Sequence, residues 1–219
     1  SSIDVSKHII EFGQLETSYI EDLVSFLNAR SQNERKRIAS IKFLSKLSNY
    51  GDPMFNCMIN HHALFEVNEA LSDKKDKIIV EALKLLINWL QNSQKYKTYL
   101  FHNICTFDFS NVCENSQYKV KFRFLKLLLY FSQNATPNDL TQLINYDTLI
   151  YIVDQIDDTD IDFSQKILDF LILVIRNCQA YPEFIQMIQN ELIELEFNNP
   201  LLSEKLFTIL ELIKQSQSS

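Results

Sequence analysis

The sequence predicts an all-α fold built from repeated helical units. Asparagine ends four apolar helical runs, FLSKLSN, LLINWLQN, LLLYFSQN and FLILVIRN, at Asn49, Asn92, Asn134 and Asn177. The intervals between these asparagines are 43, 42 and 43 residues. A fixed period of about 42 residues is typical of helical repeats, in which a unit buries its apolar helix only by stacking on its neighbours.

The composition supports helices and disfavours several other classes of protein. The 219 residues are 46% hydrophobic, which is enough for a folded core. Two glycines and four prolines supply little of the turn chemistry that an all-β fold or a phosphate-binding loop requires. The net charge of −7 disfavours nucleic acid as a partner. No apolar run reaches the length of about 18 residues that a membrane span needs, so we expect no integral membrane association and a cytoplasmic or nuclear location.

The chain divides into about five units, each with short helices followed by one long helix. Together the units are expected to form a single domain over residues 1–219, with boundaries near 1–50, 51–93, 94–135, 136–178 and 179–219. Prolines occur where a helix has to stop. Pro53, Pro137 and Pro182 lie near three of these boundaries, and Pro200 lies within the last unit.

In each unit a second helix leads through a charged turn into the long helix. This pattern aligns residues 23–36, 64–77, 149–162 and 192–205. Apolar residues of the long helices recur at steps of three and four, which predicts burial along one wide face. We expect Leu86, Trp89, Leu127 and Leu171 to be buried, and the aromatic residues Phe122, Phe124, Phe131 and Phe170 to be core residues.

The asparagine-ended runs, each followed by a break such as 51–53 or 181–182, resemble the third helix of the armadillo repeat. Residues 58–71 and 143–156 look like the helix that precedes it in that family. The resemblance covers nearly the whole chain and implies a right-handed superhelix, an α-solenoid related to HEAT-repeat proteins. It also implies that the third helices line a concave groove, where the four asparagines would bond the backbone of an extended peptide.

The chain departs from the armadillo pattern in two respects. The groove position four residues before each asparagine is tryptophan in nuclear-import receptors, and here it is Ser45, Asn88, Tyr130 and Leu173. Trp89 lies one residue away, so a nuclear-import receptor is disfavoured. The glycine between the first two helices is also missing, at 61–62 and 146–147. HEAT-like hairpins without a kink therefore remain an alternative.

Lysine follows the same period as asparagine. Lys42, Lys84 and Lys126 recur at intervals of 42 residues, and the fourth position is Asp169. Each lysine lies seven or eight residues, or two helical turns, before its asparagine, so both occupy one helix face. Such a strip would attract an acidic segment of another protein. The alternative is a solvated edge that keeps the chain soluble.

These patterns predict a non-catalytic protein-interaction module or adaptor that binds a partner segment along its groove. The expected binding residues are Lys42, Asn49, Lys84, Asn88, Asn92, Lys126, Tyr130, Asn134 and Asn177. Alternatively, the asparagines only end helices, because asparagine tolerates the left-handed conformation found there.

Two narrower likenesses suggest other functions. Residues 23–99 resemble a VHS domain, the superhelix of endosomal sorting adaptors. A length of four to five repeats is similar to the armadillo cores of Hsp70-type nucleotide-exchange factors and of formin autoinhibitory domains. Membrane-trafficking adaptor, regulator of a chaperone ATPase and autoinhibitory domain are therefore the alternative functions.

No catalytic, metal or cofactor site is predicted. The acidic turn 157–162 lacks the glycine and glutamate of an EF-hand loop, so Asp162 is expected to cap a helix. The histidines and cysteines lack the paired spacing of a zinc site, and the cysteines are expected to be buried thiols. The residues concerned are Cys57, His61, His62, His102, Cys105 and Cys113. No Ser-His-Asp set or P-loop occurs in the sequence.

Overall fold

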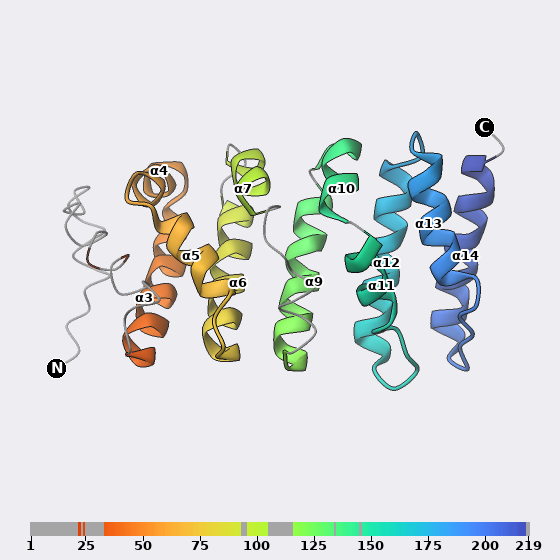
Figure 1. The fold of residues 1–219 in the computed structure, drawn as a ribbon, viewed down its shortest axis with the longest axis horizontal. Coiled ribbons are helices and arrows are strands. Elements are labelled where there is room, and N and C mark those ends of the chain that lie inside the picture. The colour runs from red at the N-terminus through yellow and green to blue at the C-terminus, as the bar shows by residue number, and fades with distance from the viewer. Residues whose placement is uncertain are drawn as a thin grey trace. The chain divides into compact units, whose positions relative to one another are not determined.

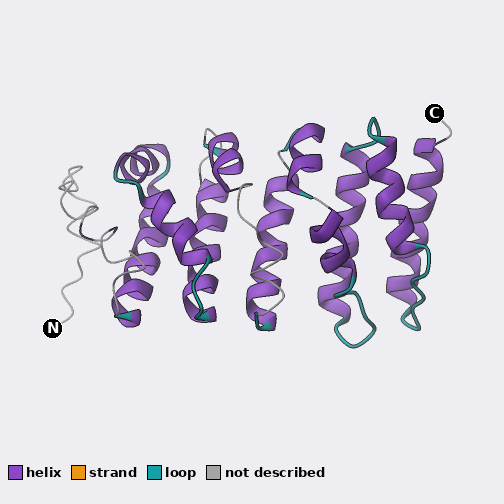
Figure 2. Ribbon diagram, viewed as in Figure 1, coloured by secondary structure: helices purple, strands orange, loops and turns teal. Residues whose placement is uncertain are grey.

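A computed structural model describes Asp22, Val24 and residues 33–92, 96–104, 116–133, 135–144 and 146–217. Over these residues the chain is helical and contains no strand (Figure 2). The chain forms two compact units, Ser1–Lys95 and Tyr96–Ser219. The all-α prediction is confirmed, whereas the single domain stays a prediction.

The described residues of the first unit form two long helices with two short α-helices between them. Helix α3 (Glu34–Leu47) continues into the 3-10 helix η1 (Ser48–Tyr50), and Gly51 turns the chain with φ at 72°. The helices α4 (Asp52–Asn60), α5 (Ala63–Leu71) and α6 (Asp76–Asn92) follow. Helix α6 packs against both α3 and α5, so α3 and α6 lie side by side (Figure 1).

A histidine forms the turn between α4 and α5. His62 has φ at 59° and ψ at 21°, in the left-handed region that glycine adopts most easily. The kink between the two short helices therefore exists without the usual glycine. The alternative of an unkinked hairpin is wrong for this repeat.

The described residues of the second unit form three long helices, with short helices before and between them. The long helices are α9 (Tyr118–Ser132), α12 (Ile161–Asn177) and α14 (Pro200–Gln217). The others are α7 (Lys97–Ile104), α10 (Pro137–Leu143), α11 (Tyr146–Val153) and α13 (Pro182–Leu192). Helix α12 packs against α9 on one side and α14 on the other. Because α13 alone precedes α14, the last repeat is a two-helix hairpin.

The helix starts follow from local sequence. Prolines open α10, α13 and α14, where the missing N–H group costs no hydrogen bond. Thr136 and Asp139 form a capping box at α10. At α12 the cap is Asp160, whose carboxylate accepts from the backbone nitrogen of Phe163 at 3.1 Å. The prediction of Asp162 as the cap is wrong, since Asp162 lies inside the first turn.

Asp157 explains why the cap falls at Asp160. Its carboxylate accepts hydrogen bonds from the backbone nitrogens of Thr159 and Asp160 and from the Thr159 hydroxyl, at 2.7, 3.0 and 2.6 Å. The hydroxyl of Thr159, followed by these backbone donors, lowers the pKa of Asp157. These hydrogen bonds fix the turn before the helix begins, so Asp160 becomes the N-cap residue that precedes Ile161.

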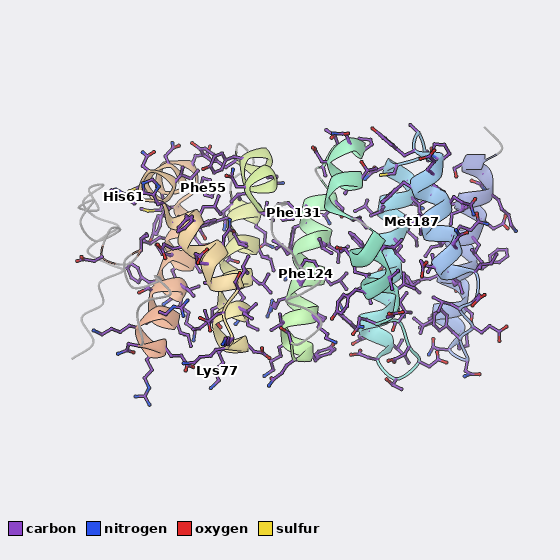
Figure 3. The ribbon with its side chains drawn as sticks, viewed as in Figure 1. Phe55, His61, Lys77, Phe124, Phe131 and Met187 are labelled. Carbon is purple, nitrogen blue, oxygen red and sulfur yellow. The ribbon has the colours of Figure 1, made fainter. Side chains whose placement is uncertain are left out.

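The core confirms the expected burial of the long helices. Leu86, Trp89, Leu127 and Leu171 are all buried. In the first unit the Trp89 ring packs edge-on against Phe55, with centroids 5.2 Å apart. In the second unit Phe124 and Phe131 are buried along α9, and Figure 3 shows Phe55 and both of these residues.

Polar contacts tie some of the turns before the long helices to the neighbouring repeat. In the first unit the guanidinium of Arg37 forms an ion pair with Asp73, and both side chains are largely buried. In the second unit Asp158 accepts from the backbone nitrogens of Asn198 and Asn199, at 2.8 and 3.3 Å. These contacts hold neighbouring long helices in register.

Candidate functional site

In the first unit the structure brings together corresponding positions of α3 and α6. The side-chain amide nitrogen of Asn88 donates to the hydroxyl of Ser45 at 2.6 Å. One helical turn further on, the amide nitrogen of Asn92 donates to the side-chain oxygen of Asn49 at 3.2 Å. Both pairs are 43 residues apart, so the sequence period places them directly opposite each other.

The pair Asn49–Asn92 leaves hydrogen-bonding capacity unused. The amide nitrogen of Asn92 also donates to the backbone oxygen of Asn88 at 2.9 Å, so both of its hydrogens are engaged. Within the described residues the side-chain oxygen of Asn92 and the side-chain nitrogen of Asn49 have no partner. Both asparagines are exposed. One free acceptor and one free donor therefore lie next to each other on the surface.

The asparagines do not adopt the left-handed conformation of a helix cap. Within the described part of the chain, His62 is the only residue other than glycine with a positive φ. Asn92 and Asn177 are the last residues of α6 and α12, as expected, but the left-handed conformation proposed as the reason for asparagine is wrong for Asn49, Asn92 and Asn177. Asn134 lies outside the described residues. The side-chain nitrogen of Asn177 donates across to the backbone oxygen of Ser132 on α9 at 3.5 Å.

The three lysines differ in their surroundings. Lys42 on α3 is exposed and forms no ion pair with any described residue. Lys84 on α6 forms an ion pair with Glu81 at 2.7 Å, one turn earlier on the same helix. Lys126 on α9 is half-buried, and its ammonium nitrogen lies 5.8 Å from the ring centroid of Tyr130. Lys126 likewise has no carboxylate partner in the described part of the chain.

The fourth position of the lysine period is neutralised within the second unit. Asp169 on α12 forms an ion pair with Lys205 on α14. The negative charge of Asp169 is therefore balanced by a neighbouring helix of the same unit. Arg37, on the same helix as Lys42, is by contrast buried and paired with Asp73.

A groove of about 300 Å³ lies between α9 and α12 of the second unit. It is lined by Phe122, Lys126, Leu129, Tyr130, Gln133 and Lys166. The four residues from α9 and Gln133, which directly follows the helix, share one face, because they are spaced at i, i+4, i+7, i+8 and i+11. Lys126 and Tyr130 belong to the predicted binding residues, and the structure places both in this groove.

Sequence reasoning missed the other residues of the groove. Phe122 was expected in the core, but it is half-exposed and lines the groove, whereas Phe124, Phe131 and Phe170 are buried as predicted. Lys166 comes from the neighbouring repeat, and its ammonium nitrogen lies 5.2 Å from the centroid of Phe122. It also donates to the backbone oxygen of Asp162 at 3.2 Å.

Cysteine and histidine form no site in the part of the chain that is described. No group of histidine, cysteine, aspartate or glutamate there has the arrangement to hold a metal ion. Cys178 is buried, which raises the pKa of its thiol to about 11. Cys57 is partly exposed, so the prediction that it is buried is wrong. Cys105 and Cys113 lie outside the described residues.

The helices of the described regions include none with both the length and the apolar character that a membrane span requires.

Comparison with known proteins identifies the fold. A structure described as computationally designed armadillo repeat proteins for modular peptide recognition gives a TM-score of 0.67 at 12% identity. The match covers 91% of this chain and 87% of that chain. A designed armadillo repeat protein in complex with the peptide (KR)4 gives a TM-score of 0.58 at 14% identity, covering 89% of this chain and 99% of that chain. An engineered protein gives a TM-score of 0.66 at 18% identity, and the match covers 90% of this chain and 81% of that chain.

The comparisons of sequence alone give no match, either to a model of a known family or to a curated protein. The structural likeness extends over about nine tenths of the chain and includes both compact units. The chain therefore has an armadillo-type helical repeat fold, an α-solenoid, as the recurring asparagines predict.

Proposed function

We propose that this protein is a non-catalytic scaffold that binds an extended, acidic segment of another protein along its long helices. The observation that carries the proposal is the charge on these helices. Lys42 in the first unit and Lys126 in the second occupy the same position of their repeats, and neither has a carboxylate partner among the described residues. An unpaired cation at a recurring position is complementary to an acidic chain.

The asparagines supply the second element of the proposed binding mode. The free side-chain nitrogen of Asn49 can donate to a peptide carbonyl, and the free oxygen of Asn92 can accept from a peptide N–H group. Each such bond contributes about 0.5–1.5 kcal/mol net. These hydrogen bonds involve the peptide backbone and not its side chains. They can therefore form with an extended segment of any sequence.

The similar designed proteins support a peptide as the ligand. The charge of the peptide proposed for this chain is opposite to that of the peptide bound by one of them. One of them is in complex with (KR)4, a peptide of lysine and arginine only. A peptide of that charge would be repelled by Lys42 and Lys126 here. The binding partner expected for this chain therefore carries aspartate or glutamate where that peptide carries cations.

The test compares an acidic peptide of alternating aspartate and serine with (KR)4, using stopped-flow association at low and high salt. Lys42→Glu combined with Lys126→Glu should slow association of the acidic peptide by about tenfold at low salt. It should also flatten the salt dependence, because screening acts on the attraction that the change removes.

The matched control is Lys74→Glu combined with Lys214→Glu, which alters net charge equally and places one change in each unit. Both control lysines are exposed and lie outside the lysine strip. We expect the control to change association by less than about twofold. Equal binding of the acidic peptide by the two variants, or preference for (KR)4, would contradict the proposed function.

A further inference from the structure

We infer that the groove between α9 and α12 is an anchor subsite for a large apolar side chain, with a carboxylate of an adjacent residue held at its rim. The inference rests on the proposed function and specifies which side chains the bound segment carries. It turns a general preference for acidic peptides into a requirement for one short motif, aspartate or glutamate beside an aromatic residue.

The size and lining of the groove indicate one apolar side chain. Its volume of about 300 Å³ is at the lower end of ligand pockets, which run from about 300 to 1,000 Å³. Phe122, Leu129 and Tyr130 supply its apolar lining. Phe122 and Tyr130 are eight residues apart, so their backbone positions are separated by about 12 Å along α9 at a rise of 1.5 Å per residue.

The charges indicate a carboxylate beside that side chain. Lys126 and Lys166 both line the groove, no acidic residue does, and neither lysine forms an ion pair with a described residue. Each ammonium group lies over an aromatic ring, at 5.8 Å from Tyr130 and 5.2 Å from Phe122. A cation held against an apolar surface attracts an anion more strongly than one in open water.

A carboxylate fits this rim better than a phosphate. No arginine lines the groove, and arginine is the residue that holds phosphate through paired hydrogen bonds. One hydrogen of the Lys166 ammonium is already used by the backbone oxygen of Asp162. The two remaining hydrogens of Lys166 and the three of Lys126 can donate to the oxygens of an aspartate or glutamate.

The corresponding positions of two other long helices, α6 and α12, do not combine these features. In the first unit the residue that matches Tyr130 is Asn88, which is bonded to Ser45 at 2.6 Å. On α12 the residue that matches Lys126 is Asp169, which is paired with Lys205. Repeats with polar residues at these positions can bind the backbone of the partner segment. The α9–α12 groove can also distinguish the side chains of that segment.

The test uses fluorescein-labelled peptides of alternating aspartate and serine and measures their affinity by anisotropy. One peptide carries a central phenylalanine beside an aspartate, and the second has alanine in its place. A third keeps the phenylalanine but has asparagine for the neighbouring aspartates, and a fourth carries phosphotyrosine. We expect the phenylalanine peptide to bind about tenfold more tightly than the alanine peptide.

Two variants assign this preference to the groove. Tyr130→Ser should reduce the advantage of phenylalanine over alanine to less than about twofold, and Lys166→Gln should reduce the advantage of aspartate over asparagine in the same way. Lys42→Glu, in the other unit, should weaken both acidic peptides alike and leave the ratio unchanged. Circular dichroism checks that the variants are folded. A photo-crosslinking benzoylphenylalanine at the phenylalanine position should label α9 or α12 of the unaltered protein.

The outcomes separate the subsite from the proposed function. Equal binding of the phenylalanine and alanine peptides, or crosslinks outside α9 and α12, would overturn the subsite and leave the scaffold function in place. Tighter binding of the phosphotyrosine peptide would overturn the assignment of a carboxylate. Failure of every acidic peptide to bind would overturn the proposed function, and the subsite with it.

Discussion

The side-chain nitrogen of Asn92 donates a hydrogen bond to the side-chain oxygen of Asn49, 3.2 Å away and 43 residues earlier in the chain. Two members of the asparagine period are therefore bonded to each other across neighbouring long helices. Because Asn92 is also held by the backbone oxygen of Asn88, its amide has a fixed orientation. A peptide that meets this pair finds its donor and acceptor already placed, which lowers the entropic cost of binding.

Replacing Asn92 by alanine should lower both the stability of the protein and its affinity for a peptide. We expect Asn92→Ala to lower the free energy of unfolding by about 0.5–1.5 kcal/mol, because its hydrogen bonds to Asn49 and Asn88 are lost. It should also hasten dissociation of an acidic peptide while leaving association nearly unchanged. Urea titration and stopped-flow kinetics measure the two effects. Asn134→Ala is expected to act on dissociation in the same way.

The control for this prediction is Asn190→Ala. Asn190 is exposed on α13, where it accepts from Gln186 at 2.9 Å, and it lies outside the asparagine period. A dissociation rate that rises equally for Asn92→Ala and Asn190→Ala would show that the asparagine pair does not hold the peptide.

Much of this surface could be predicted because the period of the sequence is also the period of the structure. Corresponding residues of stacked repeats lie opposite each other, and the 43-residue separations of Ser45–Asn88 and Asn49–Asn92 follow this period. Local spacing along α9 likewise put Lys126 and Tyr130 on one face. These inferences needed only the geometry of a helix and a constant repeat length.

The groove itself could not be predicted, because it depends on which face of α9 its neighbours cover. Phe122 and Phe124 are two positions apart, which turns them to nearly opposite sides of the helix. Both fit an apolar helical pattern, yet Phe124 is buried while Phe122 lines the groove. Lys166 is supplied by the next repeat, and no pattern within α9 points to it.

The prediction of the helix cap at α12 was wrong for a similar reason. The acidic turn holds several aspartates, and each of them is a suitable cap by residue type. The choice between Asp160 and Asp162 depends on the turn that Asp157 closes with Thr159. Composition identified the cap as an aspartate but not its position.

The buried face of α9 is expected to be essential for stability. Leu127 is completely buried, so Leu127→Ala should lower the free energy of unfolding by about 2–5 kcal/mol, since the cavity adds to the lost burial. Leu201 belongs to the same compact unit but is 54% exposed, so Leu201→Ala should cost less than about 0.5 kcal/mol. Urea denaturation of both variants gives the comparison. Similar losses would mean that Leu127 is not the core residue described above.

The ion pair Arg37–Asp73 should matter far more than a surface pair between the same helical segments. The side chains of Arg37 and Asp73 are 6% and 14% exposed, whereas those of Lys75 and Glu34, 3.0 Å apart, are 54% and 35% exposed. Arg37→Ala leaves a buried carboxylate without its cation, so we expect a loss of about 3–5 kcal/mol. Lys75→Ala should cost about 0–1 kcal/mol. A small loss for Arg37→Ala in thermal or urea unfolding would contradict the buried tether.

The buried thiol of Cys178 should make stability depend on pH in the alkaline range. Burial raises its pKa from 9.0 to about 11 in the folded protein. Between these values the unfolded chain releases the thiol proton and the folded chain retains it, so stability falls as pH rises from about 9 to 11. Below pH 9 both states are protonated and the thiol contributes no dependence on pH.

Cys178→Ala should remove this alkaline slope, although it also lowers stability at every pH by deleting a buried side chain. The informative quantity is the difference in unfolding free energy between the unaltered protein and the variant, measured by urea titration at several pH values. This difference should be constant up to about pH 9 and shrink above it, because the lysines and tyrosines are common to both proteins. A difference that stays constant up to pH 11 would show that the thiol of Cys178 ionises equally in the folded and unfolded states.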